Sequence, residues 1–131
     1  MLALRTVAGS AALLAASGAF AAEDRACTVG RFQGAAAPAG ATVTMRVVNV
    51  GRPCAIVNHG IPAERAHPAE RGAITQPPAH GSAEFAAPEA RYTPARGFPG
   101  RDEFAYEAFA RGRNDQRVHL RVRVQVDVVA P

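Results

Sequence analysis

Residues 117–129, near the end of the chain, alternate strictly between polar and apolar side chains. Every even position from Val118 to Val128 is apolar, and every odd position from Arg117 to Asp127 is polar. Successive side chains of a β-strand point to opposite faces, so this period of two fits a strand with one face on a core and the other in water. An amphipathic helix could not use the pattern, and the segment predicts a long, half-buried strand.

Shorter runs with the same period recur earlier in the chain. Val43, Met45 and Val47 alternate with polar residues, and Phe104 and Tyr106 lie two positions apart. Further candidate strands cover residues 55–58, 73–76, 83–86 and 91–93. The segments between the runs contain Gly, Pro, Asn or Asp, which favour turns. About seven short strands with no stretch of helical period predict a single all-β domain, an antiparallel β-sandwich.

The one long connection covers residues 60–71 and contains Pro62 and Pro68. Proline fixes the backbone and removes a hydrogen-bond donor, so it interrupts both helices and sheets. We expect a surface loop there, with at most a single helical turn around Ala63 to Arg65.

Residues 1–21 have the composition of a secretory signal peptide. Arg5 precedes an uncharged stretch of about 15 residues, and Ala19 and Ala21 flank Phe20 as in an A-x-A cleavage site. The stretch is shorter than the roughly 20 residues that a membrane-spanning helix needs. We therefore expect a cleaved signal peptide at 1–21, a domain at 22–131 that does not span a membrane, and a periplasmic or secreted location.

The charge of the chain is modest once this segment is set aside. The formal net charge of +4 falls to +3 for residues 22–131, which carry 14 arginines and 11 acids. The acids are interspersed with the arginines, and few aromatic side chains lie among them. Because single-stranded nucleic acids bind where aromatic side chains stack on bases beside basic ones, we expect no nucleic-acid partner.

Cys27 and Cys54 are the only cysteines in the chain. Thiols in an oxidising compartment tend to pair, and a bond between these two would close a loop of 28 residues. Loop-closure entropy gives such a bond a value of about 3.5 kcal/mol. The alternative is a pair of free thiols that binds metal or performs redox chemistry, although the C-x-x-C spacing of such sites is absent.

Residues 72–129 also carry glycines, aromatics and an aspartate at fixed offsets. The run Ile74-Thr-Gln-Pro-Pro-Ala-His-Gly81 is followed by Tyr92-Thr-Pro94, by Gly97-Phe98-Pro-Gly100, by Asp102, Phe104 and Tyr106, and by the valine-rich strand. This order resembles the bacterial immunoglobulin-like and cadherin-like modules of secreted and surface proteins. Their pattern is a strand ending in Gln-Pro-x-His-Gly, then Tyr-x-Pro, then Gly-Phe-x-Gly-x-Asp-x-Phe-x-Tyr. The resemblance implies an immunoglobulin-like sandwich.

The residue types of this motif suit structural roles. Gly97 and Gly100 permit backbone angles that are costly for other residues, and Phe98 between them can turn inward. Asp102 can accept backbone N–H groups in the turn that enters the next strand. Unlike antibody domains, the chain has no Trp. Its two cysteines lie in the N-terminal half, so we expect the disulfide to tether the first strand to an early neighbour instead of bridging the sheets at the antibody positions.

The sequence contains no recognisable catalytic motif. Ser82, the only serine after residue 21, lacks the G-x-S-x-G context of hydrolases, and no Gly-rich phosphate loop, H-E-x-x-H or paired-cysteine ligand motif occurs. We expect no enzymatic activity, no catalytic residues and no cofactor.

A metal site can be imagined from the histidines. His59 and His67 bracket the long loop and Met45 lies upstream, a set of imidazole and thioether groups of the kind that binds copper. The spacing of the histidines matches no ligand motif, Met45 alternates with valines as a core residue does, and His80 and His119 fit a turn and a polar strand face. We expect scattered histidines, with copper binding by His59, His67 and Met45 as the alternative.

A group of arginines follows the last strand and the turn before it. The members of this candidate stripe are Arg111, Arg113, Arg117, Arg121 and Arg123. Guanidinium groups bind carboxylates and phosphates bidentately, so the stripe could contact an acidic protein or an anionic envelope polymer. The alternative is an ordinary solvated strand face.

These observations, with the resemblance, lead us to expect an exported, non-enzymatic immunoglobulin-like module that has a structural or protein-binding role in the cell envelope. Its partner would be another envelope or secreted protein, or an anionic envelope polymer. Two other functions stay open: a periplasmic copper-binding protein, and an inhibitor or accessory subunit that presents an edge strand or the loop at 60–71 to its partner.

Overall fold

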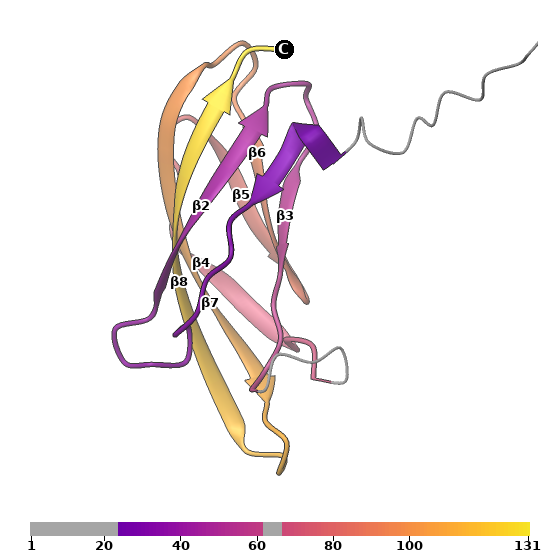
Figure 1. Ribbon diagram of the computed structural model, residues 1–131, viewed down its shortest axis with the longest axis vertical. Coiled ribbons are helices and arrows are strands. Elements are labelled where there is room, and N and C mark those ends of the chain that lie inside the picture. The colour runs from indigo at the N-terminus through magenta and orange to yellow at the C-terminus, as the bar shows by residue number, and fades with distance from the viewer. Residues whose placement is uncertain (1–23, 62–66) are drawn as a thin grey trace, which may run out of the picture.

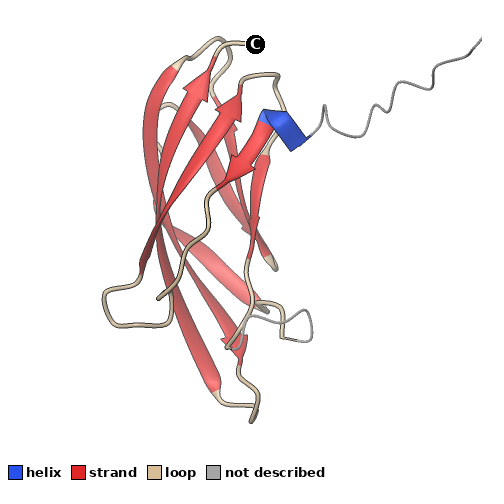
Figure 2. Ribbon diagram, in the orientation of Figure 1, coloured by secondary structure: helices blue, strands red, loops and turns tan. Residues whose placement is uncertain are grey.

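The computed structural model describes residues 24–61 and 67–131, which form an all-β sandwich of two sheets (Figure 1, Figure 2). The expected signal peptide and the expected helical turn at 63–65 lie outside the described residues. A short 3-10 helix, η2 (Asp24–Ala26), precedes the first strand. The strands are β1 (Cys27–Val29), β2 (Ala41–Val48), β3 (Cys54–Val57), β4 (Arg71–Gln76), β5 (Gly81–Ala86), β6 (Glu89–Pro94), β7 (Gly100–Arg111) and β8 (Arg117–Val129).

The strands expected from alternation are confirmed, and the longest has the predicted bounds. Its even-numbered residues are buried and its odd-numbered ones are exposed or half-buried. The structure adds an eighth strand, β1, that alternation did not predict and that only the expected disulfide pointed to. β1 has only three residues, too few for a period of two to be recognised.

The larger sheet has the order β1-β2-β8-β7-β4, and the smaller one has the order β3-β6-β5. β8 is therefore central, with β7 antiparallel on one side and β2 on the other. The β2–β8 pair is parallel, from Ala41 opposite Val122 to Val48 opposite Val129. The expectation of a purely antiparallel sandwich is wrong at this pair, because side chains alternate in the same way whichever direction the neighbouring strand runs.

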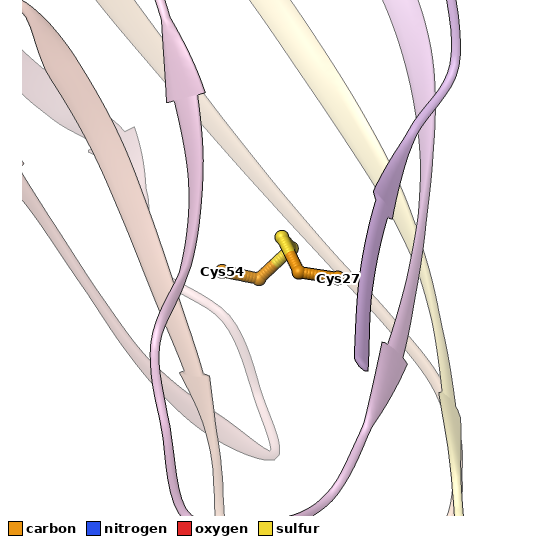
Figure 3. The surroundings of a disulfide bond; sticks show 2 residues. All are labelled: Cys27 and Cys54. Atoms are coloured by element: carbon orange, nitrogen blue, oxygen red, sulfur yellow. A yellow bond between two sulfur atoms is a disulfide. The ribbon is translucent and has the colours of Figure 1, made fainter. Parts of the chain in front are cut away.

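The disulfide between Cys27 and Cys54 is present (Figure 3), with a Cα–Cα distance of 5.3 Å. It joins β1 to β3, two early strands, as expected. These strands are edge strands of different sheets, so the bond also ties the two sheets together. The sequence did not show that the first strand and its early neighbour belong to different sheets, because sheet membership depends on long-range pairing.

The core has two parts. The main cluster lies between the sheets and contains Met45, Tyr92, Phe104, Tyr106 and the inward valines of β2 and β8, with Phe98 packed against it. A second cluster lies under the first half of β8 and consists of Ala69, Ala108, Ala110, Val118 and Leu120. This second cluster has mostly small side chains, so it removes less apolar area from water per residue.

The sandwich has two ends, which we call the disulfide end and the hairpin end. The disulfide end holds the turns at 49–53, 77–80 and 95–99, and lies at the top of Figure 1. The hairpin end holds the segments 30–40, 58–61, 86–89 and 112–116, and lies at the bottom of the same view.

Candidate functional site

Asp102 is the most connected polar side chain of the disulfide end. Its carboxylate accepts hydrogen bonds from the backbone N–H groups of Ala79 (3.0 Å), His80 (3.0 Å) and Glu103 (2.9 Å), and from the Tyr92 hydroxyl (2.8 Å). The bond to Glu103 is the local turn contact that the sequence predicts for Asp102. The others tie β7 to β6 and to the turn between β4 and β5, and no local pattern would reveal them.

At the hairpin end, the side chain of Asn58 makes a similar set of hydrogen bonds. It accepts a hydrogen bond from the Tyr106 hydroxyl, and its amide donates to the carbonyls of Ile56 (2.9 Å) and Pro88 (3.2 Å). Asn58 and Tyr106 are both buried. The pair links the end of β3 to β7 in the opposite sheet, and the sequence analysis had assigned no role to Asn58.

Both tyrosine hydroxyls stay neutral, mainly because they are buried. Burial raises the pKa of the Tyr92 hydroxyl well above its usual range, and the hydrogen bond to the Asp102 carboxylate raises that pKa further. Burial also raises the pKa of Tyr106, against a smaller opposing effect of the bond to Asn58. Neither hydroxyl is poised to exchange a proton near neutral pH, which fits a structural role for both residues.

The other residues of the family-like motif also make structural contacts. The Phe98 ring stacks on the His80 imidazole with centroids 4.3 Å apart, and the Tyr92 ring stacks on Phe104 at 5.5 Å. Pro94 lies opposite Gly81 in the β5–β6 pair. Gly97 and Gly100 adopt positive φ values of 76° and 137°, the region that favours glycine.

Three arginines of the candidate stripe lie along β8. Arg117, Arg121 and Arg123 are exposed on the outer face of the larger sheet. Arg123 forms an ion pair with Glu103, with 3.4 Å between Nε and Oε1. Within residues 24–61 and 67–131, neither Arg117 nor Arg121 forms an ion pair.

The other two arginines of the stripe lie at the tip of the β7–β8 hairpin. Arg111 is half-buried, and its Nε lies 3.6 Å from Glu70 and 3.9 Å from Asp115. Arg113 belongs to the exposed turn, where its backbone N–H donates to the Ile61 carbonyl at 3.2 Å. The stripe is thus divided, because Arg111 and Arg123 face acids while Arg117 and Arg121 face solvent.

A row of side chains that the sequence analysis missed crosses the same face. The Arg71 guanidinium lies 4.2 Å from the centre of the Phe109 ring, and that ring stacks on His119 at 4.5 Å. His119 Nε2 lies 2.9 Å from a Glu107 carboxylate oxygen. His119 is therefore half-buried in a contact row, unlike the exposed surface histidine that the alternation predicts. Cross-strand register could have revealed the row, since Arg71, Phe109 and His119 lie directly opposite one another.

Of the three copper candidates, Met45 lies in the main core, whereas the backbones of His59 and His67 lie side by side across a β-bridge. Met45 is 1% exposed in the main core. His59 lies opposite Pro68 in an isolated β-bridge, and the His67 carbonyl accepts a hydrogen bond from Gly60 at 2.7 Å. Within the part of the chain that the structure describes, no three side chains of the His, Cys, Asp and Glu types lie close enough to hold one ion.

Two grooves open at the hairpin end. One has a volume of about 600 Å³ and lies between the segment 30–37 and residues 57–61, with Phe32, Val57 and Ile61 among its lining. The other, of about 520 Å³, runs beside the first residues of β8 and is lined by Ala36, Pro38, Ile61, Arg121 and residues 116–119. Ile61 is 51% exposed and Val57 is 50% exposed, so apolar surface is accessible at this end.

Residues 24–61 and 67–131 contain no helix that is long and apolar enough to cross a bilayer. The chain matches no protein-family model, and comparisons with curated proteins and with solved structures likewise find no match.

Proposed function

We propose that this protein is an exported, non-enzymatic interaction module of the cell envelope that binds an acidic protein partner through the outer face of its larger sheet. The observation that carries the proposal is the pair Arg117 and Arg121, exposed on β8 without an ion-pair partner among the described residues. An unpaired guanidinium can form bidentate bonds to a partner carboxylate without first giving up an internal one.

Export is part of the proposal, and the disulfide supports it. Disulfides persist in oxidising compartments and are rare in the cytosol, and the bond between Cys27 and Cys54 joins the two sheets. This bond is compatible with the periplasmic or secreted location that the first 21 residues suggest.

Membership of the immunoglobulin-like class is also proposed. Tyr92 of the Tyr-x-Pro element and Asp102 of the Gly-Phe-x-Gly-x-Asp element are hydrogen-bonded at 2.8 Å. Two separate parts of the sequence pattern therefore depend on one contact, which supports the view that they belong to a single structural motif.

Binding to envelope and secreted fractions tests the function. Immobilised protein should retain a partner that is released as salt rises from about 0.05 to 0.5 M, because exposed charge pairs are screened. The variant Arg117→Glu/Arg121→Glu should lose that partner. The matched control, Arg46→Glu/Arg101→Glu, changes two exposed arginines at the other end of the same face and should retain it.

Two outcomes would count against this proposal. Equal retention by wild type and by Arg117→Glu/Arg121→Glu would remove the role of these arginines. Retention that survives protease treatment of the fraction would identify an anionic polymer as the partner in place of a protein.

The exposure of Ile61 and Val57 favours a second candidate, an inhibitor or accessory subunit that presents the 60–71 connection. If this function is the correct one, Ile61→Ser should abolish retention of the partner while Arg117→Glu/Arg121→Glu leaves it unchanged.

A further inference from the structure

β8 has two neighbouring strands along only part of its length. β7 pairs with β8 up to its last residue but one, from Arg117 opposite Arg111 to Val128 opposite Gly100. β2 begins at Ala41, opposite Val122, and pairs only from there onward. In Figure 1 the β7–β8 hairpin accordingly projects below the start of β2. Residues 117–120 of β8 therefore form a sheet edge, and at Arg121 the segment 30–40 already contacts β8.

The hydrogen bonds around β8 show which backbone groups point to this edge. The Arg121 N–H donates to the Ala35 carbonyl, and the Val129 carbonyl accepts from Asn49, both on the side away from β7. At the hairpin tip the Gly112 N–H donates to Gln116, an even-numbered residue. In an antiparallel pair, residues alternate between bonding their partner and pointing away from it. The odd-numbered residues of β8 thus point away from β7.

It follows that the N–H and C=O groups of Arg117 and His119 point into the space that β2 does not reach. Among the described residues no backbone group bonds to them on that side. Gly40 marks where this space ends: its φ is 71°, and a Cβ there would lie 2.7 Å from the Arg121 carbonyl oxygen. Only glycine lets the chain pass so close to β8 before β2 begins.

The space beside this edge is the groove of about 520 Å³. Ala36, Pro38 and Ile61 give it apolar walls, and Arg117 and Arg121 project from its outer rim on the solvent face of the sheet. A strand lying there would place alternate side chains against the apolar walls and the others beside Arg117 and Arg121, which form no ion pair with another described residue. An open strand edge is a template for pairing with another chain.

We propose that the first residues of β8 are a docking edge that accepts an extended peptide segment as an added strand, and that this segment alternates acidic with apolar residues. The acidic residues would lie beside Arg117 and Arg121, as opposite charges on neighbouring strands favour, and the apolar ones against Ala36 and Ile61. Main-chain bonds to Arg117 and His119 would supply the β-augmentation contacts. This inference rests on the proposed function, and it names the partner chemistry and the binding mode.

The probe is the capped heptapeptide Glu-Val-Glu-Val-Glu-Val-Glu, titrated into the purified protein. Two analogues keep its charge and side chains but carry N-methyl groups, one on the valines and the other on the glutamates. If the peptide pairs with the edge, one analogue should bind at least about tenfold more weakly while the other binds like the parent, since only alternate amides face β8. Loss on the glutamates indicates antiparallel pairing, and loss on the valines indicates parallel pairing.

Amide hydrogen exchange gives a direct second measurement. Bound peptide should slow exchange of the Arg117 and His119 amides, and leave those of Val118 and Leu120 unchanged because these already face β7. The variant Arg117→Gln/Arg121→Gln should weaken binding about tenfold or more, since two charge-assisted contacts are lost. Arg46→Gln/Arg101→Gln, with the same change in net charge, should bind like wild type.

Equal affinity of the three peptides, or equal weakening by both N-methyl patterns, would overturn the docking edge. If binding still depends on Arg117 and Arg121 in that case, the proposed function survives without edge pairing. If the parent peptide does not bind and partner retention is also indifferent to the arginine variants, both proposals fail.

Discussion

The two ends of the sandwich differ in how many long-range contacts hold them together. At the disulfide end, Cys27–Cys54 joins the sheets, Asp102 binds the turn at 77–80 and the Tyr92 hydroxyl, and the Asn49 amide donates to the carbonyls of Ala95 and Phe98. At the hairpin end the core is rich in alanine, two grooves open, and β8 has an unpaired edge. The covalent link between the sheets thus lies at one end of this small domain, whereas the open edge of β8 and the groove beside it lie at the other.

Removing the disulfide should have the largest effect on this difference. We expect Cys27→Ala/Cys54→Ala to lower the free energy of unfolding by about 3.5 kcal/mol, because the unfolded chain regains the entropy of the closed loop. Urea denaturation of oxidised wild type and of the variant measures this. A loss under about 1 kcal/mol would show that the disulfide end does not depend on its covalent bond.

The carboxylate of Asp102 comes next. Asp102→Asn keeps the shape but replaces one acceptor oxygen with a donor amide, so at least one buried N–H or O–H group loses its partner. We expect a loss of about 2–3 kcal/mol. The same substitution at exposed Asp127 is the control and should change stability by less than about 0.5 kcal/mol. Equal effects at the two positions would mean that the hydrogen bonds to Asp102 contribute little.

Alkaline titration separates the contributions of Tyr92 and Tyr106. Both tyrosines have a pKa that is raised on folding, so their stabilising effect is complete below the unfolded pKa of about 10 and is lost as pH rises toward the folded value. Stability should fall by about 1.4 kcal/mol per tyrosine at pH 11. Tyr92→Phe and Tyr106→Phe should each halve that fall.

This measurement is unusually free of other contributions. The basic residues are all arginine and the chain has two tyrosines, while both cysteines are bonded. No other side chain titrates between pH 9 and 11. Constant stability across this range would contradict the burial of the two hydroxyls.

The smallest effect on stability should come from the arginines of the hairpin end. Arg117→Gln and Arg121→Gln should each change the free energy of unfolding by less than about 0.5 kcal/mol, since exposed residues without ion pairs contribute little. Thermal denaturation checks this. A larger loss would mean that these two arginines stabilise the fold, and that they are not free to serve binding alone.

The sequence predicted the strands far better than their arrangement. Alternation located β8 exactly because its hydrophobic and polar residues respond to burial on one face, which is a local property. The parallel direction of β2 is not local, since nothing in the run Val43 to Val47 depends on which way its neighbour runs. Alternation did not reveal β1, because this strand is held in place by the disulfide and by pairing with β2, and neither is visible in three residues of sequence.

The candidate site shows the same limit. The odd-numbered positions of β8 identified an arginine face, but the sequence could not tell that Glu103 lies beside Arg123 while Arg121 faces solvent, because Glu103 belongs to another strand. The open edge at Arg117 and His119 depends on where β2 begins relative to β8, a register that no single segment encodes. The ties from Asp102 to Ala79 and His80 are equally long-range.

The central position of β8 also constrains the order in which the domain folds. One edge of β2 pairs with residues 122–129 of β8. This edge therefore has no partner until β8 is available. β7 and β8, joined by a short turn, can pair early as a local hairpin, whereas the parallel pair must close a long loop first. The edge of β2 therefore stays open during folding until β8 pairs with it.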